Sequence, residues 1–142
     1  MSRIYIPRSL RRKVAVQARH RCGYCLSAEA LTGIPCDIDH VIPASEGGLT
    51  IEENLWTVCS PCNQRKSDRT IAVDPKTRKW VRLFHPRRDV WADHFAWEVD
   101  GLLMIGKTAI GRATVLALQL NRELLVNARR LWIQGGWHPQ KS

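Results

Sequence analysis

The chain has 142 residues and a formal net charge of +9, with 22 Lys and Arg against 13 Asp and Glu. This length suits one domain with its own hydrophobic core. A membrane or secreted protein is not expected, because no apolar run approaches twenty residues and residues 1–10 lack the apolar stretch of a signal peptide. A cytoplasmic protein is expected instead. The basic surplus favours a polyanionic partner, although a basic protein that binds nothing specific has the same composition.

The first half of the chain predicts a helix, two strands and a second helix. Apolar residues at helical spacing indicate a helix over residues 9–20, and alternating side chains indicate a strand over residues 36–42. A turn cluster follows, and residues 49–58 fit either a second strand or a short helical turn. The last helix opens at the second of two cysteine pairs.

The second half of the chain predicts hairpins and helices. Two hairpins are expected, over residues 71–84 and 97–105. Three helices are expected, over residues 89–97, 108–120 and 122–134. We expect these elements to wrap around the first half within one compact domain. Most of the six tryptophans should lie in the core, with one or two exposed for stacking on bases.

Four cysteines form two pairs, each with a two-residue gap. The pairs are Cys22 with Cys25 and Cys59 with Cys62. This gap lets both thiolates of a pair face one ion, and two pairs complete a tetrahedral structural zinc site. A rubredoxin-type iron site for electron transfer is the main competitor. Disulfides and a redox motif are less favoured, because cytosolic thiols stay reduced and a thioredoxin-like motif has a single pair.

Three further residues near the pairs have structural interpretations. Gly23 is expected to relax the backbone of the first pair, and Pro61 to stiffen the second. Cys36 has no place among four ligands that are already complete, so it is expected to be a small buried hydrophobe.

Polar residues between and after the pairs can build a reactive site. The Asp39 carboxylate and the Asn63 amide offer hard oxygen ligands that suit Mg²⁺ or Mn²⁺. His40 can take a proton from water near neutral pH, and Asn54 can hold its ring in one tautomer. Consecutive strand side chains point to opposite faces, so Asp39 and His40 share a site only at a strand's end or bend.

Three basic residues follow Asn63 on the predicted helix, and we expect them to bind phosphates that flank the reactive site. They are Arg65, Lys66 and Arg69. Charged side chains of this kind bind phosphate oxygens without reading sequence. An ordinary solvated helix face is the alternative interpretation.

The steps Asp39-His40, Asn54 and Cys59-x-x-Cys62-Asn63 together resemble the HNH nuclease family, in its four-cysteine, zinc-stapled branch. The resemblance covers roughly residues 7–69. It implies an α+β ββα-metal fold and cleavage of phosphodiester bonds in DNA with one divalent ion. By position it implies His40 as general base, oriented by Asn54, with Asp39 and Asn63 as ligands of the catalytic ion. Asn63 stands where the family name expects a final histidine, which favours Mg²⁺ or Mn²⁺.

These inferences combine into one hypothesis. Residues 1–70 are expected to form the nuclease core, and residues 71–142 a hairpin-and-helix extension. The extension is the more basic half, +6 against +3, and no helix-turn-helix is visible, so duplex DNA held with little sequence specificity is the expected partner. RNA cleavage stays open within this hypothesis. The alternative is a zinc-bearing nucleic-acid-binding module without catalysis.

Overall fold

The computed structural model describes residues 4–140, which fall into two compact units. Unit 1 comprises residues 4–70 and 85–88, and unit 2 comprises residues 71–84 and 89–140. A short segment from the second half of the sequence therefore completes unit 1. That both halves form a single domain stays a prediction. No helix of the described residues is both long enough and apolar enough to cross a membrane.

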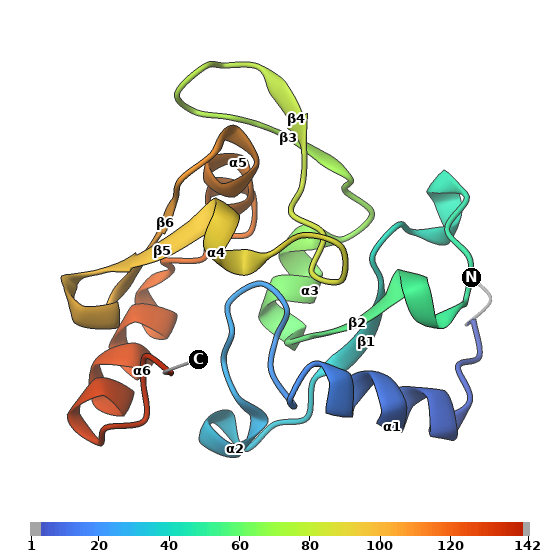
Figure 1. The fold of residues 1–142 in the computed structure, drawn as a ribbon, viewed down its shortest axis with the longest axis horizontal. Helices are drawn as coiled ribbons and strands as arrows, with labels where there is room; N and C mark the ends of the chain where they lie inside the picture. The colour runs from blue at the N-terminus through green and yellow to red at the C-terminus, as the bar shows by residue number, and fades with distance from the viewer. Residues whose placement is uncertain (1–3, 141–142) are drawn as a thin grey trace. The chain divides into compact units, whose positions relative to one another are not determined.

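Unit 1 is built on two antiparallel strands followed by a helix, which confirms the predicted α+β class (Figure 1). Strand β1 (Asp37–His40) pairs with β2 (Leu55–Val58), and α3 (Ser60–Lys66) follows. Strand β1 is shorter than predicted because the main chain of Ile42 pairs with the Asn54 side chain instead of a partner strand.

The stretch before β2 contains both structures that its sequence allowed. A 3-10 turn, η2 (Glu52–Asn54), leads directly into the strand. A second 3-10 turn, η1 (Ala44–Glu46), lies in the loop that follows β1. Both turns therefore shape the segment that connects the two strands.

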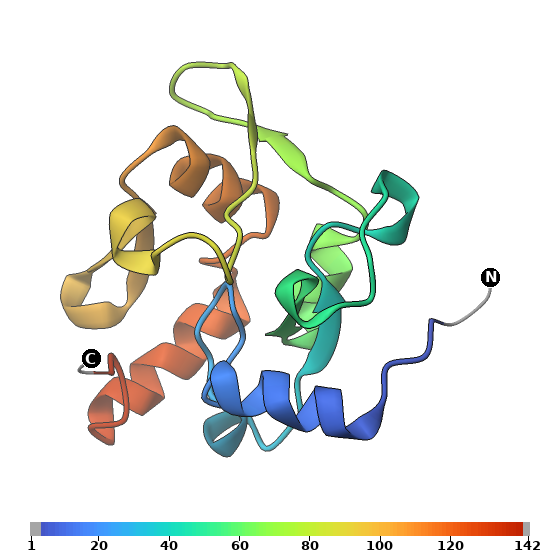
Figure 2. The ribbon, with the colours of Figure 1, turned by 45° about the vertical axis from the view of Figure 1, so that its right-hand side comes forward.

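Helix α1 (Arg8–Gln17) packs against the β1–β2 ribbon (Figure 2). Its apolar stripe buries Val14 against Ile6 and Leu55, as the helical spacing predicted. The helix ends before residue 20 because Arg19 and His20 both adopt a φ of 55°, which is left-handed. A four-residue helix that was not predicted, α2 (Glu29–Thr32), follows.

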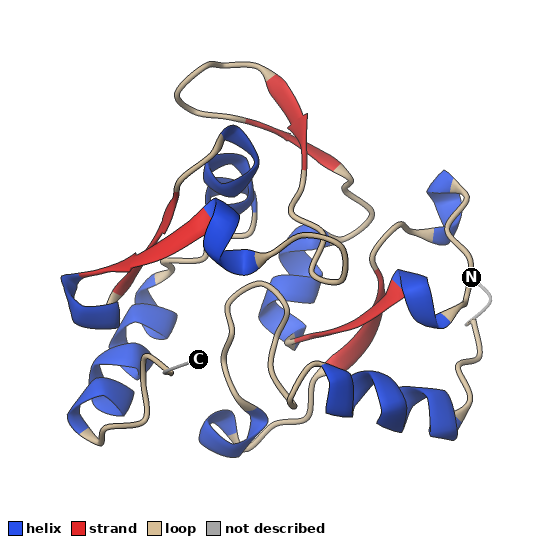
Figure 3. Cartoon of the chain, in the orientation of Figure 1, coloured by secondary structure: helices blue, strands red, loops and turns tan. Residues whose placement is uncertain are grey.

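Unit 2 contains two separate antiparallel ribbons (Figure 3). Strand β3 (Ile71–Val73) pairs with β4 (Trp80–Arg82), and β5 (Phe95–Glu98) pairs with β6 (Leu103–Gly106). The helix predicted over residues 89–97 was wrong in its second half. Only α4 (Trp91–His94) is helical, because the chain becomes extended at Phe95, whose ring is buried against Phe84 and Trp91.

Helices α5 (Ala109–Ala117) and α6 (Glu123–Gln134) complete unit 2. Helix α5 packs against β3, β4 and β6, and a turn, η3 (Val99–Gly101), joins β5 to β6 and contacts α6. The predicted inward positions Leu116, Leu124 and Leu131 were wrong, and Leu124 is 83% exposed. The buried face of α6 instead carries Leu125 and Arg129.

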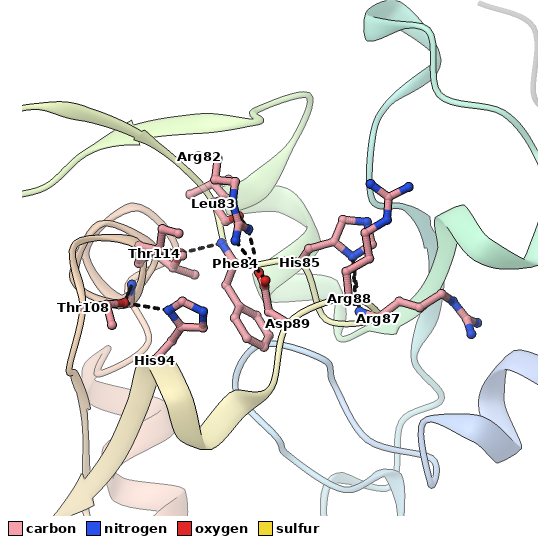
Figure 4. A network of polar contacts seen from close by, with 12 residues as sticks. Arg82, Leu83, Phe84, His85, Arg87, Arg88, Asp89, His94, Thr108 and Thr114 are labelled. Atoms are coloured by element: carbon pink, nitrogen blue, oxygen red, sulfur yellow. Dashed lines mark hydrogen bonds and ion pairs between the residues drawn. The ribbon is translucent and has the colours of Figure 1, made fainter.

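The chain between β4 and α4 is fixed by polar contacts (Figure 4). In unit 2, Arg82 binds Asp89 through two hydrogen bonds of 2.6 and 2.9 Å, and the Phe84 N–H donates to Thr114 Oγ1 at 3.0 Å. His94 Nδ1 lies 2.7 Å from Thr108 Oγ1. The contacts of Arg82, Phe84 and Asp89 thus fix the chain on either side of residues 85–88.

Candidate functional site

The two cysteine pairs meet in unit 1. Sulfur atoms of all four lie within 4.8 Å of one another, and Cys25 Sγ is 3.7 Å from Cys59 Sγ. Four Zn–S bonds of about 2.3 Å in a tetrahedron place sulfurs about 3.8 Å apart, so the cluster fits a zinc ion. No disulfide joins any of the five cysteines in this structure, so the geometry gives no support to the disulfide alternative.

The main chain around each pair turns the thiolates toward the centre. At the first pair, Leu26 N donates to Cys22 O at 3.0 Å, and Leu26 adopts a left-handed φ of 62°. Cys59 follows β2 directly and caps α3, which carries the buried Cys62 on its first turn. The end of a strand and the start of a helix thus supply the second pair.

Gly23 is needed for space, which differs from its expected role. Its φ is not in the left-handed region, so backbone freedom is not what the position requires. A Cβ atom there would lie 2.3 Å from Trp56 Cδ1 and 2.8 Å from Pro86 Cβ. The indole of β2 therefore packs directly on the backbone of the first cysteine pair.

Cys36 lies outside the four-cysteine cluster. It is only partly buried, so the prediction of a buried hydrophobe was too strong. Its main-chain N–H donates to the Glu29 carboxylate. Burial, followed by the negative charge of Glu29, raises the pKa of the Cys36 thiol to about 12.

An open pocket of about 520 Å³ lies beside β1 and α3. Its lining brings together three of the four predicted reactive residues, namely Asp39, His40 and Asn63, while Asn54 is not part of it. Asp39 and His40 face one pocket although they are neighbours on a strand. This is possible because His40 is the last residue of β1, where the alternation of faces ends.

The His40 ring contacts Thr50, not Asn54. His40 Nε2 lies 2.9 Å from Thr50 Oγ1. The buried Asn54 amide accepts from Ile42 N and donates to the carbonyls of Ile42 and Leu49, each at 2.9 Å. The predicted hydrogen bond between Asn54 and the His40 ring is therefore absent from this structure. Asn54 instead closes the loop that follows His40.

The Asp39 carboxylate faces a buried cation. Lys66 Nζ lies 3.0 Å from Asp39 Oδ2 and donates to the His40 carbonyl at 3.3 Å. The Lys66 side chain is only 1% exposed. Burial raises the pKa of Asp39, and the Lys66 ammonium opposes that rise. Because Lys66 contacts Oδ2, the other carboxylate oxygen of Asp39, Oδ1, is the one that could bind a metal ion.

Asn63, on helix α3, lies against the face of β1 that carries the carboxylates of Asp37 and Asp39. Its Nδ2 donates to Asp37 Oδ2 at 3.3 Å, and Asp37 and Asp39 share that face because they are two residues apart on the strand. The amide oxygen of Asn63 and the carboxylate of Asp39 are hard ligands on one pocket wall, so this donor set fits Mg²⁺ or Mn²⁺.

The three basic residues of α3 and its end are not equivalent. Arg69 is exposed, and Arg65 is half-buried with its Nη1 donating to Pro61 O at 3.0 Å. Lys66 is buried against Asp39, so it is not a surface contact for a flanking phosphate. The expectation of phosphate binding is retained as a prediction for Arg65 and Arg69.

Thr50, Lys66 and Asp37 contact predicted site residues in ways that the sequence reasoning missed. A period-two pattern on β1 was sufficient to place Asp37 beside Asp39. No local pattern indicates the contact of Thr50, because it lies in the loop ten residues from His40. The buried position of Lys66 depends on how α3 packs against β1.

Comparison with known proteins found matches to part of the chain. A family model described as HNH endonuclease matches residues 22–69. The Septu protein PtuA of Bacillus mycoides (strain KBAB4) is 31% identical over 88 residues, which cover 55% of this chain and 12% of that protein. The CRISPR-associated endonuclease Cas9 of Corynebacterium diphtheriae is 37% identical over 54 residues, which cover 37% of this chain and 5% of that protein.

The chain thus spans a small part of each of these relatives, and no solved structure matches it. The matched residues nevertheless contain both cysteine pairs, strands β1 and β2, and all of α3. This chain therefore carries an HNH endonuclease domain, which spans residues 22–69.

Proposed function

We propose that this protein is a metal-dependent endonuclease that hydrolyses phosphodiester bonds in DNA. The observation that carries the proposal is the shared pocket wall of Asp39, His40 and Asn63, which combines a carboxylate, an imidazole and an amide. The family match over residues 22–69 supports nuclease chemistry in general. DNA is proposed as the substrate because that is what the resemblance to the HNH family implies, and the basic surplus of the chain suits a polyanion.

Asp39 and Asn63 are the residues that would hold the catalytic ion. A bound Mg²⁺ or Mn²⁺ would neutralise charge on the scissile phosphate and stabilise the leaving oxygen. Lys66 keeps the Asp39 carboxylate paired with a positive charge, since it lies 3.0 Å from Oδ2. The carboxylate is therefore held in place on the wall of the pocket.

His40 would act as the general base. If Nε2 carries a proton and donates it to Thr50 Oγ1, Nδ1 keeps its lone pair and can accept a proton from water. Thr50 then fixes the tautomer that Asn54 was expected to fix. Asn54 contributes by holding the loop that follows His40, through its three main-chain hydrogen bonds.

The test is plasmid nicking by zinc-loaded protein with Mg²⁺ or Mn²⁺. We expect His40→Ala to lower the cleavage rate by about 10²–10⁴-fold, the usual contribution of a general base. His20→Ala is the matched control, because His20 is exposed and paired with Glu29 outside the pocket. Equal cutting by wild type and His40→Ala would remove His40 from the mechanism.

The alternative is a zinc module that binds nucleic acid without cutting it. It predicts salt-sensitive DNA binding and no cleavage with any divalent ion. Metal analysis of the purified protein separates zinc from iron in the cysteine cluster. We place the protein in the reducing cytoplasm, because thiols must stay reduced to hold zinc.

A further inference from the structure

We infer that the β3–β4 hairpin of unit 2 is a second nucleic-acid contact, which binds an unpaired strand. Three cations at its tip, Lys76, Arg78 and Lys79, would bind phosphates, and Trp80 would stack on a base. The inference deepens the proposed function, because it concerns how the same chain holds a nucleic acid. It requires no cleavage, so the two can be tested separately.

The charge of the tip is positive and unopposed. All three cations are exposed, and none of them belongs to the ion pairs found among residues 4–140. The hairpin's own carboxylate, Asp74, is fully buried and engaged by Arg112 through two hydrogen bonds of 2.9 Å. The negative charge of Asp74 therefore neutralises Arg112 and not Lys76, Arg78 or Lys79.

Hydrogen bonds within the turn hold the tip in one conformation. Asp74 also accepts hydrogen bonds from the N–H groups of Lys76 and Thr77 and from Thr77 Oγ1, the last at 2.8 Å. Across the turn, Asp74 N donates to Lys79 O at 2.9 Å and Arg78 N donates to Asp74 O at 2.8 Å. A preformed loop loses little conformational entropy on binding, which favours its use as a contact surface.

Trp80 lies open beside these cations. It is 68% exposed and directly opposite Val73, while Ile71, which pairs with Arg82, continues the same face of the ribbon. The opposite face carries the buried Ala72. The ribbon thus buries one face and leaves an indole on the other. An exposed indole stacks on any base that is not already stacked in a duplex, which favours a single strand.

An acidic protein segment would be attracted to the same charges. Nucleic acid is the better match because the surface combines several cations with a flat aromatic ring, and the chain carries an HNH endonuclease domain. An acidic peptide would use the charges but would gain little from the indole. The two partners can therefore be separated by substituting Trp80.

The experiment measures binding of a labelled single-stranded DNA and of its duplex by fluorescence anisotropy, with the zinc-loaded His40→Ala full chain. Trp80→Ala should weaken single-strand binding about tenfold and duplex binding much less, while Trp80→Phe should restore most of the loss. Trp137→Ala is the matched control, since Trp137 is 59% exposed in the same unit. It should bind like the parent.

A second arm varies the salt concentration. Changing Lys76, Arg78 and Lys79 together to Gln should lower the slope of log affinity against log salt by about 2, because each single-strand phosphate contact contributes about 0.7. Arg130→Gln, at an exposed position of α6, should leave the slope unchanged. Unchanged binding by Trp80→Ala, or an unchanged slope for the triple variant, would overturn the inference. Binding of a polyglutamate peptide that survives Trp80→Ala but not the triple change, with DNA binding unaffected by either, would assign the surface to an acidic protein.

Discussion

At the scale of single residues, the side chains of His40 and Asp39 are each oriented by one neighbouring polar group. His40 has one ring nitrogen 2.9 Å from Thr50 Oγ1, and Asp39 has one oxygen 3.0 Å from the ammonium of Lys66. Each contact occupies one side of a functional group and leaves the other side for a ligand. Thr50 and Lys66 are therefore positioning residues in the proposed reaction.

Thr50→Val should slow cleavage with little effect on folding. Valine keeps the shape of threonine but cannot bind His40 Nε2, so the ring is no longer held in one tautomer. We expect a single-turnover rate that is about fivefold lower, since a hydrogen bond is worth about 1 kcal/mol and about 1.4 kcal/mol is a factor of ten. Plasmid nicking with Mn²⁺ at several pH values measures it.

Thr50→Ser provides the matched control for this prediction. Serine retains the hydroxyl and should restore most of the rate, together with the pH profile of the wild type. A purely structural role of Thr50 would instead lower the thermal unfolding midpoint of the valine variant and leave its pH profile unchanged. That result would contradict the orienting role.

At the scale of elements, the β3–β4 turn is held by one buried carboxylate. Asp74 is engaged by Arg112 of α5 and by Thr77 of the turn, and it therefore joins the hairpin to the helix. These hydrogen bonds, first those from Arg112, hold the pKa of Asp74 well below its usual range. A depressed pKa means that the folded state stabilises the ionised form.

Asp74→Asn should destabilise the protein in a pH-dependent way. The stabilisation by Asp74 is present above the pKa of an unfolded aspartate, about 3.9, and is lost as the pH falls toward the lower folded pKa. The difference in thermal unfolding midpoint between wild type and Asp74→Asn should be largest at neutral pH and should narrow below about pH 3.9. Asp100→Asn, at an exposed turn, is the control and should show a small difference at every pH. A constant gap for Asp74→Asn would exclude this linkage.

At the scale of the whole molecule, unit 1 extends beyond the residues 22–69 that match the HNH family model. The segment of residues 85–88 belongs to unit 1. Its Arg87 donates to Leu55 O at 3.1 and 3.2 Å and to Gln17 at 2.8 Å, and its guanidinium lies 4.8 Å from the centre of the Trp56 ring. Arg87 thereby joins β2 to α1.

Arg87→Ala should weaken unit 1 although it lies far along the chain. Hydrogen bonds from a charged group and a cation–π contact are lost together, so we expect a loss of about 2 kcal/mol. Hydrogen exchange at the amides of β2 measures the opening free energy directly. Arg88→Ala, at the neighbouring exposed residue, is the control and should change this opening free energy by less than about 0.5 kcal/mol. Equal effects of the two variants would contradict the joining role of Arg87.

Loss of the metal should affect unit 1 first. Cys62→Ser removes a buried ligand, so the protein should bind less than one zinc per chain and lose exchange protection in β2. Amides of β6 and α5 in unit 2 should keep their protection, because all four ligands lie in unit 1. Cys36→Ser is the control and should retain zinc. Equal zinc content in both serine variants would contradict the assignment of the ligands.

The α+β class and the buried stripe of α1 followed from spacing along the chain, because helical and strand repeats constrain geometry within a few residues. The meeting of the two cysteine pairs followed from chemistry instead, because one structural zinc ion takes four ligands and each pair supplies two. The contacts of His40 with Thr50 and of Leu55 with Arg87 were decided only by the tertiary structure. These partners lie 10 and 32 residues apart, and loops of that length can close in many ways until packing selects one. Sequence thus determined which groups are available for chemistry, while folding determined which atom of each group faces a neighbour.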